Sequence, residues 1–245
     1  MTRTHVLTGA GSGIGREVAR RLTDRGDQVI LLARTEERVD DLVREFPTYY
    51  SAHPVDLADP DAVVAFAREL GRGRPAIERI DSLVHVAGVV DLGPVADLDA
   101  ANWQHHLDVN LTAPALLTAG LLPLLRPGHG TVVFVNSTAG LAASAGWSAY
   151  AASKFGLRAL ADSLRAEEAA YGVRVTTVFP SRTATPMQEQ VHEQEGLLYD
   201  PSRWIRPETV ADEIVRILDL PSDATITDVT VRSATVGGPR DPRQG

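Results

Sequence analysis

Short runs of β-branched and other apolar residues alternate along this chain with longer segments in which apolar residues recur every three or four positions. The short runs are typical of strands buried on both faces, and the longer segments of amphipathic helices. Their alternation indicates successive β-α-β units with right-handed crossovers. We therefore predict an α/β fold, a doubly wound parallel sheet of about seven strands with helices on both faces. Six strands are predicted, at His5–Thr8, Gln28–Ala33, Ser82–Val86, Thr131–Asn136, Arg174–Phe179 and Asp228–Val231.

The helical segments and the remaining regions define the domain organisation. At 245 residues and without an internal repeat, the chain predicts a single domain over residues 1–236. Residues 237–245, rich in Gly, Pro and alternating charge, are predicted to be a flexible tail. Residues 186–207 break the alternation just after a strand, where open α/β sheets bind ligands, and are predicted to form a substrate lid. The predicted helices are Arg16–Arg25, Glu36–Glu45, Asp61–Leu70, Ala101–Leu125 and Ala151–Tyr171, with Gly26 and Gly172 placed to end two of them.

Composition excludes several classes of function. The chain has 44% hydrophobic residues, no cysteine and a formal net charge of −8, so it predicts a folded domain with no disulfide, no thiolate metal site and no attraction to nucleic acid or to anionic membranes. We predict no metal site of any kind. The longest apolar stretch, Ala113–Leu125, is interrupted by two prolines and is shorter than the ~20 residues that cross a bilayer. The N-terminus lacks a secretory pattern, so we expect a cytoplasmic protein.

A glycine-rich turn follows the first predicted strand and opens the first helix. Its spacing is TGxxxGxG, set by Gly9, Gly13 and Gly15, and it does not meet the GxGxxG pattern. Glycines let a backbone turn sharply and approach a pyrophosphate closely, and a helix N-terminus favours the negative charge of that group. The turn therefore predicts a dinucleotide site, although a purely structural turn is an alternative. The predicted contacts in it are Gly9, Gly11, Ser12, Gly13, Ile14 and Gly15.

Lys154 is the only lysine among the 24 lysine and arginine residues of the chain, and it stands four positions after Tyr150. On a helix this spacing places both side chains on one face, with Cβ atoms roughly 5–6 Å apart. An ammonium group there would favour the phenolate and lower the pKa of Tyr150. A lysine also differs from arginine in its compact, tunable charge, so the pair predicts a chemical role for both residues.

Together these motifs resemble the short-chain dehydrogenase/reductase family of about 250 residues, nearly end to end. The TGxxxGIG turn, Asp56-Leu57, Ala87-Gly88, Asn110, Ser137 and Tyr150-x-x-x-Lys154 occur in the family order. The resemblance implies a Rossmann-type fold and hydride transfer between a ketone and a secondary alcohol. It also implies cofactor contacts at Asp56, Leu57, Ala87, Gly88, Tyr150, Lys154, Pro180, Thr183 and Thr185.

Two positions depart from the family pattern. His85-Val86 replaces the asparagine that usually precedes Ala-Gly, so the hydrogen bonds which that asparagine makes must be made otherwise or lost. Ser181 replaces the usual glycine after Pro180, which should narrow the backbone freedom there locally.

The end of the second strand bears on the choice of dinucleotide. By the family alignment Ala33 occupies the position of the acid that selects NAD, and Arg34 comes next. An arginine there pairs with a 2′-phosphate, so we predict NADP(H), with NAD(H) possible. Two observations weaken this prediction. Ser12 stands where many NADP-binding relatives have a second basic residue, and the acidic Glu36 and Glu37 are close enough to repel a phosphate.

The resemblance also assigns the catalytic roles. Tyr150 would be the proton donor in reduction and the acceptor in oxidation, and its pKa must then fall from about 10 towards the working pH, helped by Lys154 and an oxidised nicotinamide. Lys154 would hold the nicotinamide ribose. Ser137 would hydrogen-bond the substrate oxygen, and Asn110 would anchor a water linked to Lys154.

The substrate and the assembly are less constrained. Ser137, Trp147, Tyr150 and Met187 are predicted substrate contacts, and Val89, Val90, Leu141, Leu197, Leu198 and Trp204 are further candidates for an apolar cleft. We expect a medium-sized, largely apolar ketone or secondary alcohol. A 3-oxoacyl-thioester reductase and a non-catalytic binding or regulatory protein remain alternatives. A homotetramer, or else a homodimer, is expected from the family.

Overall fold

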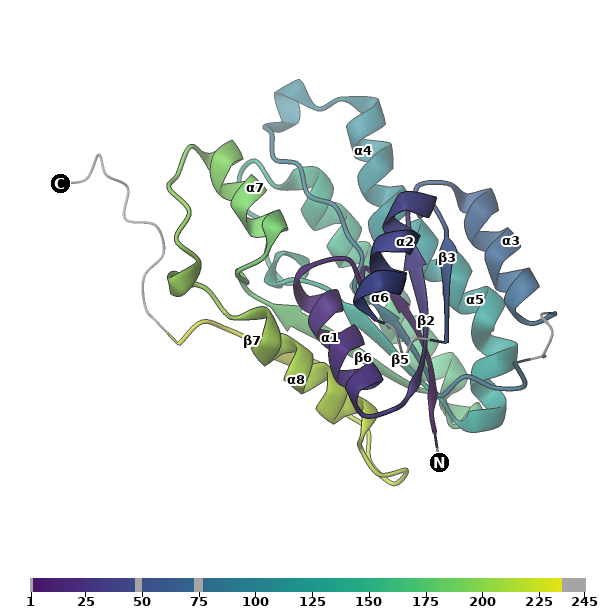
Figure 1. Cartoon of the computed structure of the whole chain (residues 1–245). Coiled ribbons are helices and arrows are strands. Elements are labelled where there is room, and N and C mark those ends of the chain that lie inside the picture. The colour runs from purple at the N-terminus through teal and green to yellow at the C-terminus, as the bar shows by residue number, and fades with distance from the viewer. Residues whose placement is uncertain (1, 47–49, 73–76, 235–245) are drawn as a thin grey trace.

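Seven parallel strands form one twisted sheet at the centre of the computed structural model, which describes residues 2–46, 50–72 and 77–234 (Figure 1). Their order is β3-β2-β1-β4-β5-β6-β7, and every neighbouring pair is parallel. The predicted α/β doubly wound sheet is therefore confirmed. The strands are β1 Thr4–Thr8, β2 Gln28–Ala33, β3 Ser51–Pro54, β4 Ser82–His85, β5 Thr131–Val135, β6 Arg174–Pro180 and β7 Asp228–Val231.

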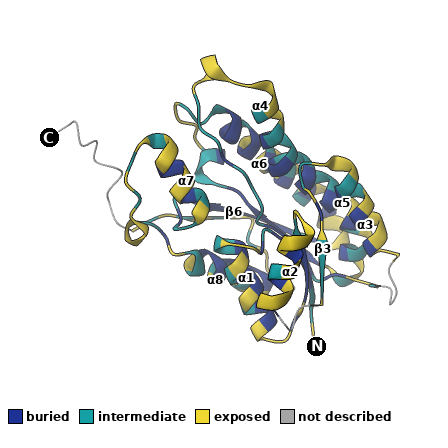
Figure 2. Ribbon diagram, turned by 45° about the horizontal axis from the view of Figure 1, so that its top comes forward, coloured by how far each residue is buried: buried dark blue, intermediate teal, exposed yellow. Residues whose placement is uncertain are grey.

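Helices cover both faces of the sheet because successive residues of each buried strand point to opposite faces. On one face, Val6 and Phe134 pack in a core cluster with residues of α3, α5 and α6. On the other, Leu7 and Val133 pack with residues of α1, α2 and α8. The outer surfaces of the helices remain exposed (Figure 2). The helices are α1 Gly13–Asp24, α2 Glu36–Glu45, α3 Pro60–Leu70, α4 Ala100–Leu107, α5 Ala113–Leu125, α6 Ser148–Glu168, α7 Pro186–Glu195 and α8 Pro207–Leu218.

The strand order reverses between β1 and β4, which are adjacent in the sheet. The chain proceeds outward from β1 to β2 and β3, then returns to place β4 on the other side of β1. Connections leaving two neighbouring strands in opposite directions open a crevice beyond their carboxyl ends. The glycine turn after β1 and residues Val86 to Gly88 after β4 lie at this crevice.

The boundaries agree with the sequence prediction for most elements, but three elements were not predicted. β3 was not predicted, nor were α7 and α8, which occupy and follow the predicted lid 186–207. Short helical turns join other elements, including η2 Asp108–Thr112, η4 Thr138–Gly140 and η6 Pro201–Arg203. The predicted tail 237–245 lies outside the described residues.

The predicted helix Ala101–Leu125 is confirmed in its extent, although it contains Pro114 and Pro123 and is divided by a π-helical turn. Helical backbone runs from Ala100 to Gly128, and within the described residues it is the one helix long and apolar enough to span a membrane by length and composition. The π-helical turn η2 just before Pro114 accommodates the missing proline N–H. Leu117, Leu121 and Leu125 are fully buried in the core, and a core helix passes the same test of length and composition.

Candidate active site

The glycine turn is held by contacts that exclude a side chain. Gly9 has φ +78°, and a Cβ there would lie 2.6 Å from the Ala87 amide nitrogen. A Cβ on Gly15 would lie 2.0 Å from the Gly9 carbonyl oxygen. Because both distances are far below contact, the turn packs backbone against backbone next to the end of β4. Ser12, the N-cap of α1, makes no side-chain capping bond, which leaves the first amide groups of the helix available to an anion.

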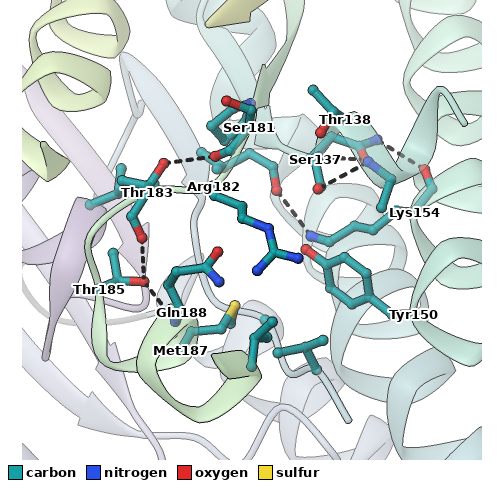
Figure 3. A pocket seen from close by; sticks show the side chains of 18 of the residues that line it. Ser137, Thr138, Tyr150, Lys154, Ser181, Arg182, Thr183, Thr185, Met187 and Gln188 are labelled. Atoms are coloured by element: carbon teal, nitrogen blue, oxygen red, sulfur yellow. Dashed lines mark hydrogen bonds between the residues drawn. The ribbon is translucent and has the colours of Figure 1, made fainter. Parts of the chain in front are cut away.

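A cavity of about 570 Å³ extends from this turn to the amino end of α6. Figure 3 shows part of its wall, with Tyr150 and Lys154 on α6 facing the Ser181–Thr185 segment and α7. Thr185 contacts the glycine turn, since a Cβ on Gly13 would lie 2.7 Å from its methyl carbon. The cavity thus joins the predicted cofactor end and the predicted chemical end. The predicted site residues that line it are Gly9, Ser12, Gly13, Ile14, Ala87, Gly88, Ser137, Trp147, Tyr150, Lys154, Pro180, Thr183, Thr185 and Met187.

The other predicted site residues lie outside the cavity wall. Gly15 is buried beneath the turn, and Gly11 is exposed. Arg34 follows the carboxyl end of β2 and is exposed, as is Asp56 after β3. Leu57 is partly buried and packs against the core. A role of these residues in holding a dinucleotide therefore stays a prediction.

Tyr150 and Lys154 occupy the first two turns of α6, on the same face, as predicted. The Lys154 Nζ donates a hydrogen bond to the Val135 carbonyl oxygen at 3.1 Å and lies 5.7 Å from the centroid of the Tyr150 ring. Asn136 fixes this part of α6 to the end of β5, because its Nδ2 donates to the Lys154 carbonyl oxygen at 2.9 Å. Ser137 follows directly, and its Oγ accepts from the Ala139 amide at 3.1 Å as it caps η4.

Burial controls the ionisation of both groups. It raises the pKa of Tyr150 to about 12, against an opposing effect of the Ser137 hydroxyl. It also lowers the pKa of Lys154 to about 8. In the protein without a cofactor, the prediction that Lys154 lowers the pKa of Tyr150 is therefore wrong. The ammonium lies over the ring face and bonds to a carbonyl, and removing the phenolate from water outweighs any attraction between the two.

Asn110 lies within η2 and is 1% exposed, behind the cavity wall. Its Oδ1 accepts from the Val89 amide at 2.9 Å, and its Nδ2 donates to the Val89 carbonyl at 2.9 Å and to Ser153 Oγ at 3.0 Å. The side chain is thus used to hold the loop after β4 against α6. A Cβ on Gly88 would lie 3.1 Å from Asn110 Oδ1 and 3.7 Å from Lys154 Nζ, so the strand end passes between these two side chains.

Other groups replace the missing family asparagine at the end of β4. Thr8 Oγ1 accepts from the amides of Val86 and Ala87 at 3.1 and 3.2 Å. The buried His85 ring stacks on Phe134 with centroids 5.0 Å apart, and its Nε2 is 2.9 Å from Thr118 Oγ1. Burial lowers the pKa of His85 to about 3, with a smaller contribution from the charge of Lys154, so the ring is neutral.

Ser181 fits its position without strain. Among the described residues the only non-glycine with positive φ is His129, so Ser181 has an ordinary backbone conformation. Its amide donates to the Val231 carbonyl at 2.8 Å, and its Oγ accepts from the Ser233 amide at 3.2 Å. The narrower freedom of serine therefore has no cost here, because the hydroxyl ties the ends of β6 and β7 together.

Helix α7 covers one side of the cavity and is fastened to the loop after β4. Gln190 Nε2 donates to the Val90 carbonyl at 3.2 Å and to Asp91 Oδ1 at 3.1 Å. Gln194 Nε2 donates to the same carboxylate oxygen at 3.0 Å, and its Oε1 accepts from the Leu92 amide at 2.9 Å. Of the apolar candidates, Val90, Trp147 and Met187 line the cavity, whereas Val89, Leu141, Leu197, Leu198 and Trp204 do not. Leu198 is 96% exposed.

Sequence reasoning missed several lining residues. Gln188 and Val191 lie on α7, and Thr138, Ala139, Ala142 and Ser144 lie between β5 and α6. Arg182 and Arg232 also line the cavity, and both follow the ends of strands that are adjacent in the sheet. Their position after strand ends was the available signal, but nothing local distinguishes these arginines from the others on the surface.

The glycine turn, the crevice and the Ser137–Tyr150–Lys154 arrangement define the class of dinucleotide-dependent α/β oxidoreductases. Residues 3–196 match the model of the short chain dehydrogenase family. The chain belongs to this family and is an oxidoreductase.

Similar proteins cover nearly the whole chain. The 2-dehydro-3-deoxy-D-gluconate 5-dehydrogenase of Bacillus subtilis is 29% identical over 231 residues, 90% of this chain and 89% of that protein. A metagenomic short-chain oxidoreductase solved in complex with NADP is 31% identical, with a TM-score of 0.78 over 95% of this chain and 98% of that one. A variant of actinorhodin polyketide ketoreductase solved with NADPH is 25% identical, with a TM-score of 0.84 over 95% of this chain and 96% of that one.

Proposed function

We propose that the chain is an NADP(H)-dependent oxidoreductase that interconverts a ketone and a secondary alcohol, with Tyr150 as the proton-transferring residue. The observation that carries this proposal is the shared cavity, which places the Tyr150 phenol, the Ser137 hydroxyl and the glycine turn on one continuous wall. A carbonyl reduction needs a hydride on carbon and a proton on oxygen, and a nicotinamide bound here would supply or take the hydride.

The residues present fit a dinucleotide. Gly9, Gly13 and Gly15 leave no room for a Cβ, and the uncapped start of α1 offers amide groups to a pyrophosphate. Thr183 and Thr185 follow the end of β6 and line the cavity, and Thr185 lies next to Gly13. Both would orient the nicotinamide carboxamide. Lys154 would hold the ribose next to it.

Within the cavity the chain's own residues favour reduction. A phenol with its pKa raised to about 12 is protonated at neutral pH and can donate its proton to a substrate oxygen. The hydroxyl of Ser137 would hydrogen-bond the same oxygen and stabilise the negative charge that develops on it. Lys154, with its pKa at about 8, is mostly protonated at pH 7. The oxidation direction requires a lower Tyr150 pKa, which the positive charge of an oxidised nicotinamide would promote.

The preference for NADP(H) rests on Arg34. Its side chain is exposed directly after β2, which pairs with β1, and no ion pair among the described residues includes it. The nearby Arg38, in contrast, pairs with Asp41 at 3.1 Å. An unpaired guanidinium at the end of β2 suits a 2′-phosphate, and the NADP-bound neighbours support the same choice. Arg34→Ala should raise the KM for NADPH by about 10- to 100-fold and leave the KM for NADH nearly unchanged, with Arg38→Ala as the matched control.

The activity is tested with a panel of ketones and secondary alcohols, assayed with NADPH, NADP⁺, NADH and NAD⁺ by absorbance at the nicotinamide band. The apolar wall formed by Val90, Trp147, Met187 and Val191 supports a largely apolar, medium-sized substrate. Tight NADPH binding without turnover of any member of the panel would instead favour the non-catalytic alternative. A clear preference for NADH would refute the role of Arg34.

We further propose a homotetramer or a homodimer that pairs α5 and α6 with those of a second copy. The outward Phe155 on α6 is 43% exposed and Tyr171, just after that helix, is 50% exposed, which supports burial by a partner. Light scattering that gives the mass of a monomer at working concentration would contradict this.

A further inference from the structure

A charged side chain that the proposed mechanism does not use stands in the cavity wall. Arg182 follows the end of β6 in the Pro180–Thr185 turn, lines the cavity together with Tyr150 and has 25% of its side chain exposed. Figure 3 shows its guanidinium group extending between Gln188 and Tyr150. We propose that Arg182 binds a carboxylate group of the substrate. The substrate is then an oxo acid and the product of its reduction is the corresponding hydroxy acid. This inference rests on the proposed function and specifies its substrate class.

The charge balance of the cavity supports an anionic ligand. The chain as a whole has a formal net charge of −8. Among the described residues, however, no aspartate or glutamate lines the cavity, whereas Lys154, Arg182 and Arg232 do. A wall that carries only cations in an acidic protein attracts anions locally, and it does so more strongly where water is partly excluded.

The surroundings of Arg182 leave it free to bind on its cavity side. Its Nη1 and Nη2 donate to Glu195 Oε2 and Oε1 at 2.7 and 2.5 Å. Glu195 lies at the end of α7 and does not line the cavity, so this pair holds the guanidinium from outside. A guanidinium has five N–H donors, and Glu195 occupies two of them. Among the described residues no other hydrogen bond from Arg182 is made.

Aromatic rings fix the orientation of the guanidinium near the reacting groups. Its Cζ lies 5.8 Å from the centroid of the Trp147 ring and 5.5 Å from that of Trp204. Trp147 also contacts Tyr150 edge-on, with centroids 5.8 Å apart. One indole therefore touches both the predicted proton donor and the predicted anion receptor. A substrate lying along Trp147 would present its carbonyl to Tyr150 and its carboxylate to Arg182, with apolar carbons between them.

The first experiment measures binding and does not depend on turnover. Butanoate, hexanoate and octanoate, each against its amide, are titrated calorimetrically into the protein with and without NADP⁺. At least one acid should bind about 10- to 100-fold more tightly than its amide, the range expected for a hydrogen-bonded charge pair. Arg182→Met should abolish that ratio while changing NADP⁺ affinity less than about twofold. Equal binding of acids and amides by the wild type, or a ratio that survives the substitution, would overturn the inference.

Two further variants control for misfolding and for a nonspecific effect of charge. Arg182→Gln keeps a hydrogen-bond donor for Glu195 but removes the positive charge. It serves as the test if Arg182→Met fails to fold, and it should bind acids no more tightly than their amides. Arg206→Met removes one positive charge from an exposed position outside the cavity and should leave the ratio unchanged. Loss of NADP⁺ affinity in both Arg182 variants would assign the guanidinium to the cofactor and overturn the proposal.

Turnover separates this inference from the proposed function. Acetoacetate, levulinate and 5-oxohexanoate are assayed with NADPH against their methyl esters. We expect at least one acid to exceed its ester about tenfold or more in kcat/KM, and Arg182→Met to lower only the value for the acid. Esters reduced as well as acids would refute the role of Arg182 while supporting the oxidoreductase. No reduction of any ketone despite selective acid binding would refute the proposed activity and leave the anion site standing.

Discussion

Two buried clusters of titratable and hydroxyl side chains lie at opposite edges of the same sheet. The carboxyl-edge cluster consists of Ser137, Tyr150 and Lys154. The amino-edge cluster consists of His5, Asp27 and Ser82, where His5 Nδ1 is 2.7 Å from Ser82 Oγ and His5 Nε2 is 3.2 Å from Asp27 Oδ2. The N-terminus, and with it the amino-edge cluster, lies at the end of the molecule opposite α4 and α7 (Figure 1).

The amino-edge cluster has the hydrogen-bond order of a serine–histidine–aspartate triad, yet it can reach no substrate. His5 and Ser82 are each 1% exposed, and neither lines the cavity that contains Tyr150. Burial lowers the pKa of His5 to about 4, against the attraction of Asp27. In the carboxyl-edge cluster Tyr150 and Lys154 are buried and Ser137 is partly buried, and all three line the large cavity. Residue types and hydrogen bonds therefore do not distinguish a chemical site from a structural one, and access to a cavity at the carboxyl ends of the strands does.

The sharpest test of this contrast is Tyr150→Phe. Removing the phenolic oxygen deletes the proposed proton donor while the ring still fills its place, so kcat should fall about 10³-fold. The melting temperature and the Kd for NADPH should stay close to wild type. A nearly wild-type kcat would show that Tyr150 does not transfer the proton and that the carboxyl-edge cluster, like the amino-edge cluster, only stabilises the fold.

Lys154→Arg is expected to have the next largest effect. The charge survives, but the longer planar group cannot donate to the Val135 carbonyl from the same place, so kcat should fall about 100-fold and KM for NADPH should rise. Steady-state kinetics with circular dichroism as a control for folding would check this. Unchanged kinetics would mean that any positive charge suffices at this position.

Much of the carboxyl-edge cluster could be predicted from the sequence because its signals are local. The spacing of Tyr150 and Lys154 fixes their common helix face, and the glycines of the turn follow from backbone geometry. Ser137, at the end of the fifth strand, was assigned through the family resemblance. The edge strand Ser51–Pro54 was missed because it is four residues long, mostly only partly buried, and ends in proline, so it has neither a buried run nor alternation.

The remaining features depend on contacts between distant segments. Arg182 becomes part of the cavity only because α7 folds back over it and the two tryptophans lie beside it. The direction of the Tyr150 pKa depends on how fully the ring is buried, which spacing along a helix does not reveal. Positions that follow from a residue type at a fixed offset were therefore predictable, whereas features set by burial or by the packing of α7 were not.

At the amino edge, Asp27→Ala should change stability and leave catalysis intact. The substitution removes the partner of His5 and Arg25 and the acceptor of the Arg3 amide, whose distance is 3.2 Å. The free energy of unfolding should fall by about 2 to 3 kcal/mol, the cost of leaving buried polar groups unpaired. Urea denaturation measures it, with the neighbouring exposed Asp24→Ala as a control that should differ from wild type by less than about 0.5 kcal/mol. A fall in kcat at constant stability would connect this edge to the chemistry.

The pH dependence of stability tests both edges together, because each edge contributes one buried histidine. The pKa is lowered to about 4 for His5 and to about 3 for His85, while both should titrate near 6.5 in the unfolded chain. Below pH 6.5 the unfolded state therefore binds protons that the folded state refuses. The free energy of unfolding should fall by up to about 1.4 kcal/mol per pH unit for each histidine as pH drops towards 4. Above pH 6.5 neither histidine should make this free energy depend on pH.

His5→Asn removes one of the two largest contributions and leaves those of His85 and of the less buried His53, whose pKa burial also lowers. Urea denaturation between pH 7.5 and 4.5 should then give a smaller slope than that of the wild type, with kcat at pH 7 unchanged. A slope equal to that of the wild type would mean that His5 is protonated in the folded protein. His5 and Asp27 would then form an ion pair, and the amino-edge cluster would not be a neutral hydrogen-bonded triad.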